Sequence, residues 1–155
     1  MREEGRPFDV IEAGLSVRDD DIVRIIIRIE ALEVVKASDQ GENLVAVHKR
    51  AANILAAAKW TSVAGDLLTA SDLPEVESAL IGQLSDTKRS VADHLRIENY
   101  RGALLSIAAL RQNVDAFLDG VLVNDEDEAV RARRLNLLAN VCSLSEGLAD
   151  LSKLA

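Results

Sequence analysis

The chain has 155 residues, of which 48% are hydrophobic and 28% charged, a composition typical of one soluble globular domain. The net charge of −8 counts against a general nucleic-acid binder, because such proteins usually carry a basic excess. The longest stretch without a charged residue, 135–145, is too short to span a membrane. The single cysteine excludes an internal disulfide, so we expect a cytoplasmic protein with no membrane partner.

Apolar residues recur at helical spacing from the start of the chain. The pattern predicts a first helix over residues 7–17, opened by a proline, and a second over 19–37, where three aspartates suit the positive end of the helix dipole. After the turn SDQGEN, a third helix is predicted over 42–59. Residues 60–73 lack clear periodicity, and we expect a flexible loop there.

Three further helices are predicted in the second half of the chain. One runs from Pro74 to about residue 96, the next covers 100–121, and the last spans 127–153 with apolar residues at alternating steps of four and three. The sequence therefore predicts an all-α bundle of five to six helices that forms a single domain over residues 1–155.

Charges are sorted by sign at the start of the last predicted helix. Four acids occupy residues 125–128, where the helix dipole favours them, and Asp125 or Asp127 can serve as the N-cap. Three arginines follow after the first turn. Cap chemistry therefore explains the order of the two signs.

Arg134 falls on the apolar stripe of this helix, so its guanidinium needs a partner out of water. Asp115 and Asp119, near the end of the preceding helix, are candidates if the two helices pack as a hairpin. We favour this structural ion pair over a ligand role for Arg134. Arg131, one turn earlier, lies on a more exposed flank.

The third predicted helix carries a polar group on one flank. Lys49 and Asn53 are four residues apart, and Arg50 lies three before Asn53, so the three side chains share a face. Two cations and an amide suit a phosphate and a base or ribose edge. An ordinary solvated helix face has the same spacing and is the commoner explanation.

Known catalytic and metal-binding patterns do not occur in the sequence. There is no glycine-rich phosphate loop, no Gly-x-Ser-x-Gly turn and no Glu-x-x-His pair. Cys142 and two distant histidines, His48 and His94, do not suggest a metal cluster. We therefore expect neither a metal site nor a catalytic residue in this chain.

Four stretches carry a resemblance to a known family. They are RPFDVIEAGLSV, KRAANIL, YRGALLSIAALRQNVDAFLDGVLVNDEDEAVRARRL and LADLSKL. In order, and over almost the whole chain, they resemble the C-terminal anticodon-binding region of the bacterial glycyl-tRNA synthetase beta subunit. The third stretch is the most specific, through its tyrosine, its Ala-Leu and Leu-Arg pairs, Val-Asp-Ala-Phe and the closing Arg-Leu.

The resemblance implies a helical DALR-type domain that holds the anticodon arm of tRNA(Gly), as the tail of a longer beta subunit. It also implies an assembly of two alpha and two beta subunits in which the alpha subunit binds ATP, magnesium and glycine, so that this chain alone has no ligase activity. Lys49, Arg50 and Asn53 match the family's Lys-Arg-x-x-Asn pattern, and Arg131 and Arg134 match its Arg-x-x-Arg. These residues are the tRNA contacts that the resemblance implies.

The chain departs from the family at a few positions. Arg133 stands where Asn is usual, Leu118 where a second Phe is common, and residues 145–148 in place of a Phe-Leu-Arg-Val run. An alternative of a different class stays open, a helical protein-interaction module that binds no RNA. The acidic middle, with a net charge of −8 over residues 61–128, and the 3% aromatic content are consistent with it.

Overall fold

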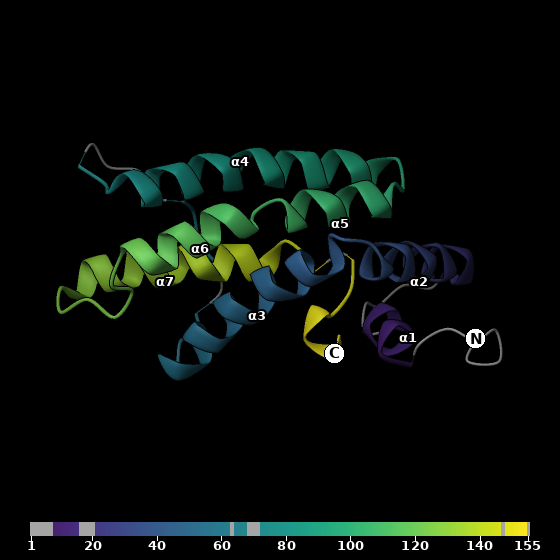
Figure 1. Ribbon diagram of the computed structural model, residues 1–155, viewed down its shortest axis with the longest axis horizontal. Coiled ribbons are helices and arrows are strands. Elements are labelled where there is room, and N and C mark those ends of the chain that lie inside the picture. Colours follow the sequence, from purple (N-terminus) through teal and green to yellow (C-terminus); the bar gives the residue numbers. More distant parts are fainter. Residues whose placement is uncertain (1–7, 16–20, 63, 68–71, 147, 155) are drawn as a thin grey trace.

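The computed structural model describes residues 8–15, 21–62, 64–67, 72–146 and 148–154. Their regular structure is entirely helical, which confirms the all-α prediction. The elements are α1 (Phe8–Leu15), α2 (Ile22–Ala37), α3 (Gly41–Ala57), α4 (Glu75–Arg96), α5 (Tyr100–Ala108), α6 (Arg111–Gly120), α7 (Glu128–Ser143) and the short 3-10 helix η2 (Leu151–Lys153). In Figure 1, α4 forms the upper edge, α5 and α6 lie along it, and α3 and α7 lie below them.

Two helices begin where the sequence places a capping aspartate. The Asp21 carboxylate accepts hydrogen bonds from the N–H groups of Val23 and Arg24 at 2.9 and 3.2 Å, and α2 begins at the next residue. Asp127 caps α7 in the same way, accepting from the Ala129 N–H at 2.9 Å. Both starts follow from local chemistry. Asp127 is one of the two N-cap candidates named from the sequence, and Asp21 is the last of the three aspartates expected at the start of the second helix.

The helix predicted over 100–121 is two helices, α5 and α6, separated by a tight turn. The Leu110 N–H donates to the Ile107 carbonyl at 3.0 Å, three residues back, which tightens the chain there. The Ala109 carbonyl accepts from Nε2 of Gln83 on α4 at 3.0 Å, and Leu110 is completely buried. Packing against α4 therefore interrupts a sequence pattern that is continuous.

The helix predicted over 127–153 is also too long, since α7 ends at Ser143. The chain then turns back, and η2 packs on α1 and α3. The Asp150 N–H donates to the Ala13 carbonyl of α1 at 3.1 Å, and Leu151 is buried. The last apolar residues of the predicted stripe, Leu148 and Leu151, are buried, but they lie in the folded-back segment and not in a continuation of α7.

The loop predicted over 60–73 contains no helix where it is described, and part of it lies outside the described residues. The Gly65 N–H donates to Oδ1 of Asn136 at 2.7 Å, and Nδ2 of Asn140 donates to the Gly65 carbonyl at 3.0 Å. The described middle of the loop is therefore fastened to α7, and the flexibility of the loop stays a prediction.

Aliphatic side chains fill the core, as the low aromatic content requires. The largest fully buried side chains are one aromatic, Phe117, and otherwise aliphatic: Ile29, Leu32, Leu44, Leu80, Leu84, Leu104, Ile107, Leu110, Leu135, Leu138 and Leu148. Between α2 and α5, the buried Arg28 guanidinium lies 5.5 Å from the centre of the Tyr100 ring. Among the described helices, none is long and apolar enough to cross a membrane.

Candidate nucleic-acid interface

Arg134 is buried against a carboxylate of α4. It is 8% exposed, its Nε donates to Oε1 of the fully buried Glu77 at 2.8 Å, and its Nη1 donates to the Leu122 carbonyl at 2.8 Å. The predicted pairing of Arg134 with Asp115 and Asp119 is therefore wrong, because α7 directs this side chain toward α4 instead of α6.

Arg133, which departs from the family pattern, pairs with the same carboxylate. Its Nε lies 2.8 Å from Oε2 of Glu77, and Asp125 Oδ2 lies 3.5 Å from Nη1 of Arg134. Two guanidiniums and two carboxylates thus connect α4, α7 and the loop before α7. Their charges balance, so this cluster offers no net positive charge to a phosphate.

Arg50, and not Arg134, forms ion pairs with Asp115 and Asp119. Its Nη1 bonds to Asp115 Oδ1, and its Nη2 lies 3.8 Å from Asp119 Oδ1. The Arg50 side chain is 41% exposed, so it reaches solvent, but carboxylates of α6 already pair with its charge. Arg50 is therefore a weaker candidate for a phosphate contact than its spacing suggested.

Lys49 and Asn53 are exposed on the outer face of α3. Among the described residues, neither has a side-chain hydrogen bond or an ion pair. The segment from Lys49 to Lys59 contains no acidic residue, and Ala56 and Ala57 are exposed beyond Asn53. The outer face of α3 is therefore a narrow strip, free of acids of its own, that leads to the C-terminal end of the helix.

A Schellman turn with a lysine at its left-handed position ends α3. The Trp60 N–H donates to the Leu55 carbonyl at 2.9 Å, the Lys59 N–H donates to the Ala56 carbonyl at 3.1 Å, and Lys59 has φ of 56°. Glycine is the usual residue here, because a β-carbon makes this conformation less favourable by about 1–2 kcal/mol. Lysine retains that strain and brings a long cation to the end of the strip.

Arg131 faces this turn from the first part of α7. Its Nη2 donates to the Ala58 carbonyl at 3.3 Å, and its Nε donates to Oδ1 of Asn124 at 2.9 Å. Within the part of the chain that the structure describes, no carboxylate pairs with it. Arg131 thus connects the end of α3 to the loop before α7 and keeps its positive charge unmatched.

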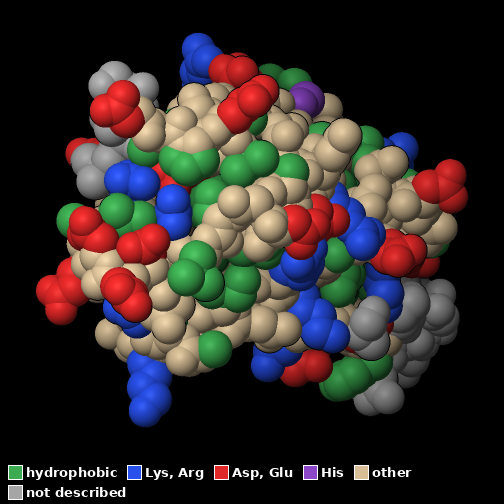
Figure 2. Space-filling model, turned by 60° about the vertical axis from the view of Figure 1, so that its left-hand side comes forward, with side chains coloured by type: hydrophobic (Ala, Val, Ile, Leu, Met, Phe, Trp, Pro, Cys, Tyr) green, Lys and Arg blue, Asp and Glu red, His purple; other side chains and the backbone are tan. Residues whose placement is uncertain are grey.

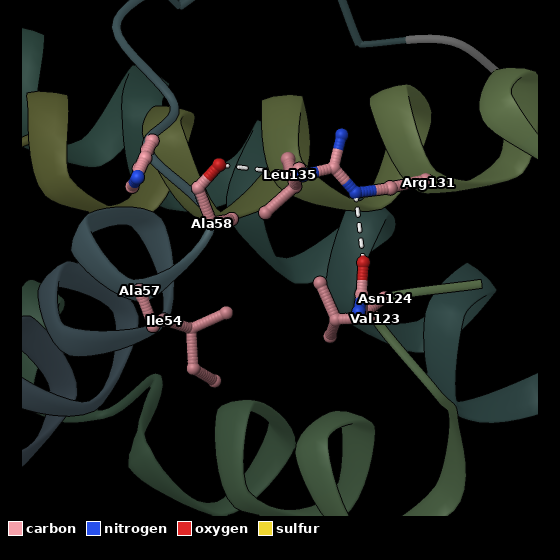
Figure 3. A pocket seen from close by; sticks show the side chains of 8 residues that line it. Ile54, Ala57, Ala58, Val123, Asn124, Arg131 and Leu135 are labelled. Atoms are coloured by element: carbon pink, nitrogen blue, oxygen red, sulfur yellow. Dashed lines mark hydrogen bonds between the residues drawn. The ribbon is translucent and has the colours of Figure 1, made fainter. Parts of the chain in front are cut away.

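These elements enclose a pocket of about 290 Å³. Figure 3 shows Ile54 and Ala57 on one side of it, Val123 and Asn124 on the other, and Arg131 hydrogen-bonded at its edge. Most of the lining is apolar, and both of its charged side chains are cations. The full lining is Ile54, Ala57, Ala58, Lys59, Val123, Asn124, Arg131 and Leu135.

The wider surface is mixed in sign. On the face that Figure 2 brings forward, Lys and Arg side chains are interspersed with Asp and Glu, and no broad positive area forms. Glu126, Asp127 and Glu128 are exposed at the start of α7. On this face, therefore, no broad positive area is available to a polyanion, and the strip on α3 and the rim of the pocket are local cationic sites.

His48 and Cys142 are half-buried and lack partners arranged for catalysis. Burial lowers the pKa of His48, an effect that the Asp150 carboxylate partly offsets, and burial raises the pKa of the Cys142 thiol to about 11. Both groups are therefore held in their neutral forms. Across the described residues, no group of three or more His, Cys, Asp and Glu side chains is arranged to hold a metal ion.

The helical fold and the cationic rim of the pocket fit a class of domain that binds the anticodon of tRNA, and a family match supports this class. Residues 44–151 match the DALR anticodon binding domain, so the chain belongs to this family. It is 39% identical over 155 residues to the glycine–tRNA ligase beta subunit of Phenylobacterium zucineum (strain HLK1), covering 99% of this chain and 23% of that protein. It is 37% identical over 159 residues to the glycine–tRNA ligase beta subunit of Rhodospirillum centenum (strain ATCC 51521 / SW), covering 99% and 22%.

The resemblance read from the sequence is thus confirmed, and the chain spans less than a quarter of the length of these relatives. Sequence reasoning missed Lys59 and Asn124, which border the pocket. A positive φ at a lysine and a pocket between a helix end and a loop do not follow from residue spacing. The acid-free run that ends at Lys59 was the available signal.

Proposed function

We propose that this chain holds the anticodon arm of tRNA(Gly) as a domain of a glycine–tRNA ligase beta subunit. One observation carries the proposal. The region that matches the anticodon-binding family, residues 44–151, contains both the acid-free strip of α3 and the pocket with its cationic rim. A folded RNA loop offers phosphates to the strip and unpaired bases to the pocket.

The geometry narrows the contacts that were expected from the sequence. Lys49 and Asn53 are exposed, and Arg131 carries an unmatched charge, so we retain all three as tRNA contacts and add Lys59. Arg134 would have to leave Glu77 before it could touch RNA, and we assign it a structural role.

The same proposal covers the assembly. The beta-subunit names of the relatives support a partner alpha subunit, and we propose an assembly of two alpha and two beta subunits in the cytoplasm. ATP, magnesium and glycine would bind to the alpha subunit. This chain would contribute tRNA affinity and identity checking to glycylation, and no step of the ligase reaction itself.

Titration with labelled tRNA(Gly), and with a version altered in the anticodon, tests the proposal. Both the chain and its intact assembly with the alpha subunit should be titrated over a salt series. We expect tighter binding of the unaltered tRNA and a shallow salt dependence. For each phosphate contact, log K should fall by about 0.7 to 0.9 per tenfold rise in salt concentration, and only a few contacts are expected. Absent binding, or equal binding of both RNAs by both samples, would favour the protein-interaction module instead.

Lys49→Ala should lower tRNA affinity about threefold to tenfold without changing the melting temperature, because an exposed and unpaired cation contributes little to folding. The matched control is Arg101→Ala, which removes another exposed cation, at the start of α5. An equal loss in both variants would indicate general charge attraction without a defined face.

A further inference from the structure

The pocket between α3 and α7 has a lining that suits one class of ligand. Ile54, Val123 and Leu135 present apolar surface. On the α3 side, Ala57 and Ala58 have small side chains that leave space in the pocket. Its volume of about 290 Å³ lies just below the range of roughly 300–1,000 Å³ that is usual for small-molecule pockets. A group with the size of one heterocyclic base fits such a space.

The charges at the rim of the pocket indicate that its ligand carries a negative group beside an apolar or aromatic one. Lys59 and Arg131 line the pocket, and no carboxylate does. An apolar side chain of a protein partner would gain nothing from two cations, whereas a nucleotide carries a phosphate beside its base. We infer that this pocket takes one unstacked nucleobase of the bound RNA loop, with the adjoining phosphate held by Lys59 and Arg131. The inference rests on the proposed function and specifies its ligand contact.

The backbone at Lys59 supports the assignment independently. The same Schellman turn ends α4, where Glu98 has φ of 57° and the Asn99 N–H donates to the His94 carbonyl at 2.8 Å. Glu98 lies 3.7 Å from Arg24, so its side chain has an intramolecular partner. Lys59 has none among the described residues, although its conformation is equally strained. Strain kept without an internal contact is typical of functional positions.

Abasic substitution in the RNA tests for the base. A hairpin with the anticodon-arm sequence of tRNA(Gly) is prepared intact and with each loop nucleotide in turn made abasic, which removes the base and keeps the phosphate. We expect one loop position at which the loss of the base weakens binding about tenfold or more. The remaining positions should change affinity less.

A pocket-filling variant connects that position to the protein. Ala57 is exposed in the last turn of α3, so Ala57→Phe fills the pocket with little effect on the fold, which a melting curve checks. It should weaken binding of the intact hairpin by the same factor as the abasic change. The variant and the abasic hairpin together should lose no more than either alone, because both remove the same contact.

Lys59→Gly separates function from stability. Glycine relieves the left-handed strain, so the melting temperature should stay equal or rise, while RNA affinity falls severalfold and the salt slope decreases by about one phosphate. Glu98→Gly relieves the same strain at the end of α4 and should leave RNA affinity unchanged.

The outcomes separate the two levels of the proposal. If the intact hairpin binds but neither the abasic series nor Ala57→Phe and Lys59→Gly changes its affinity beyond the Glu98→Gly control, the pocket assignment is overturned and the proposed function stands. If neither this chain nor its assembly binds the intact hairpin or tRNA(Gly), the proposed function is overturned and the pocket assignment with it.

Discussion

Glu77 holds two arginines of α7 from inside the molecule, and Glu77→Gln tests how much the bundle depends on that contact. Glutamine keeps the size of the side chain but removes its charge, and its amide nitrogen then faces a guanidinium donor where a carboxylate oxygen had accepted. The substitution therefore removes the countercharge that both arginines share and leaves one of them short of a hydrogen bond.

The expected magnitude follows from burial. The Glu77 side chain is 0% exposed, and those of Arg134 and Arg133 are 9% and 21% exposed. Removing one partner of a buried ion pair costs about 3–5 kcal/mol, because the remaining charge stays out of water without compensation. Asp125, 3.5 Å from Arg134, retains part of the compensation, so we expect a loss of about 3 kcal/mol, the lower end. For a domain of this length, that corresponds to a fall of roughly 6–12 °C in melting temperature.

Urea denaturation at neutral pH, followed by far-UV circular dichroism, measures the change in the free energy of unfolding. The matched control is Asp93→Asn, since Asp93 and Arg96 form a pair of nearly the same length, 2.9 Å, with side chains that are 68% and 74% exposed. That variant should lose less than about 0.5 kcal/mol. Equal losses in the two variants would refute the argument that burial makes the Glu77 contact strong.

Four further substitutions or reagents give sharp outcomes. Because burial raises the pKa of Cys142 to about 11, alkylation by iodoacetamide at pH 8 should be at least about 100-fold slower in the folded protein than in urea. Burial also lowers the pKa of His48 below 6.5, so the unfolded state takes up the proton first; stability should fall as pH drops below 6.5, and urea titrations of His48→Gln should lack that part of the decline. Gly41→Ala should lower the free energy of unfolding by about 2 kcal/mol or more, because a β-carbon would lie 2.1 Å from the Lys36 carbonyl oxygen. Gly82→Ala, with nothing within 4 Å of the new carbon in α4, should instead stabilise by about 0.5–1 kcal/mol.

The starts of α2 and α7 were predictable from the sequence, and the break between α5 and α6 and the end of α7 were not. Capping by Asp21 and Asp127 involves only the next few backbone N–H groups, so the sequence contains all the information. The break at Leu110 and the end of α7 at Ser143 depend on distant contacts, such as the hydrogen bond that Gln83 donates from α4. Apolar periodicity continues across both points and therefore predicts helices that are too long.

The need of Arg134 for a buried partner was predictable, but the identity of that partner was not. Helical spacing shows which face a residue occupies and leaves open which helix packs against it. A usable signal existed nonetheless, because Glu77 lies three residues before Leu80 and seven before Leu84, on the apolar stripe of α4. Opposite charges on two apolar stripes indicate a pair more strongly than aspartates near a helix end.

The exposed part of the candidate site was easier to predict than its charge balance. Lys49 and Asn53 lie on the predicted polar flank of α3, since a flank needs only the helical period. Arg50 shares that flank, but Asp115 of α6 neutralises it, and this contact spans 65 residues of sequence. Lys59 escaped prediction because the rules for helix ends expect glycine or asparagine at its position.

The net charge of −8 and an RNA-binding role are compatible because the charges act locally. At physiological salt the screening length is about 8 Å, so a phosphate at the pocket responds mainly to the nearest side chains. Lys59 and Arg131 line that pocket without a carboxylate, while Arg50 and Arg134 are paired with acids elsewhere. The net negative charge of the rest of the chain disfavours general attraction of a polyanion. An RNA duplex lying along the molecule therefore gains little electrostatic binding free energy. A loop that places a single nucleotide in the pocket gains the attraction of Lys59 and Arg131. If the chain holds an RNA loop as proposed, the acidic surface adds to selectivity by disfavouring RNAs that do not enter the site.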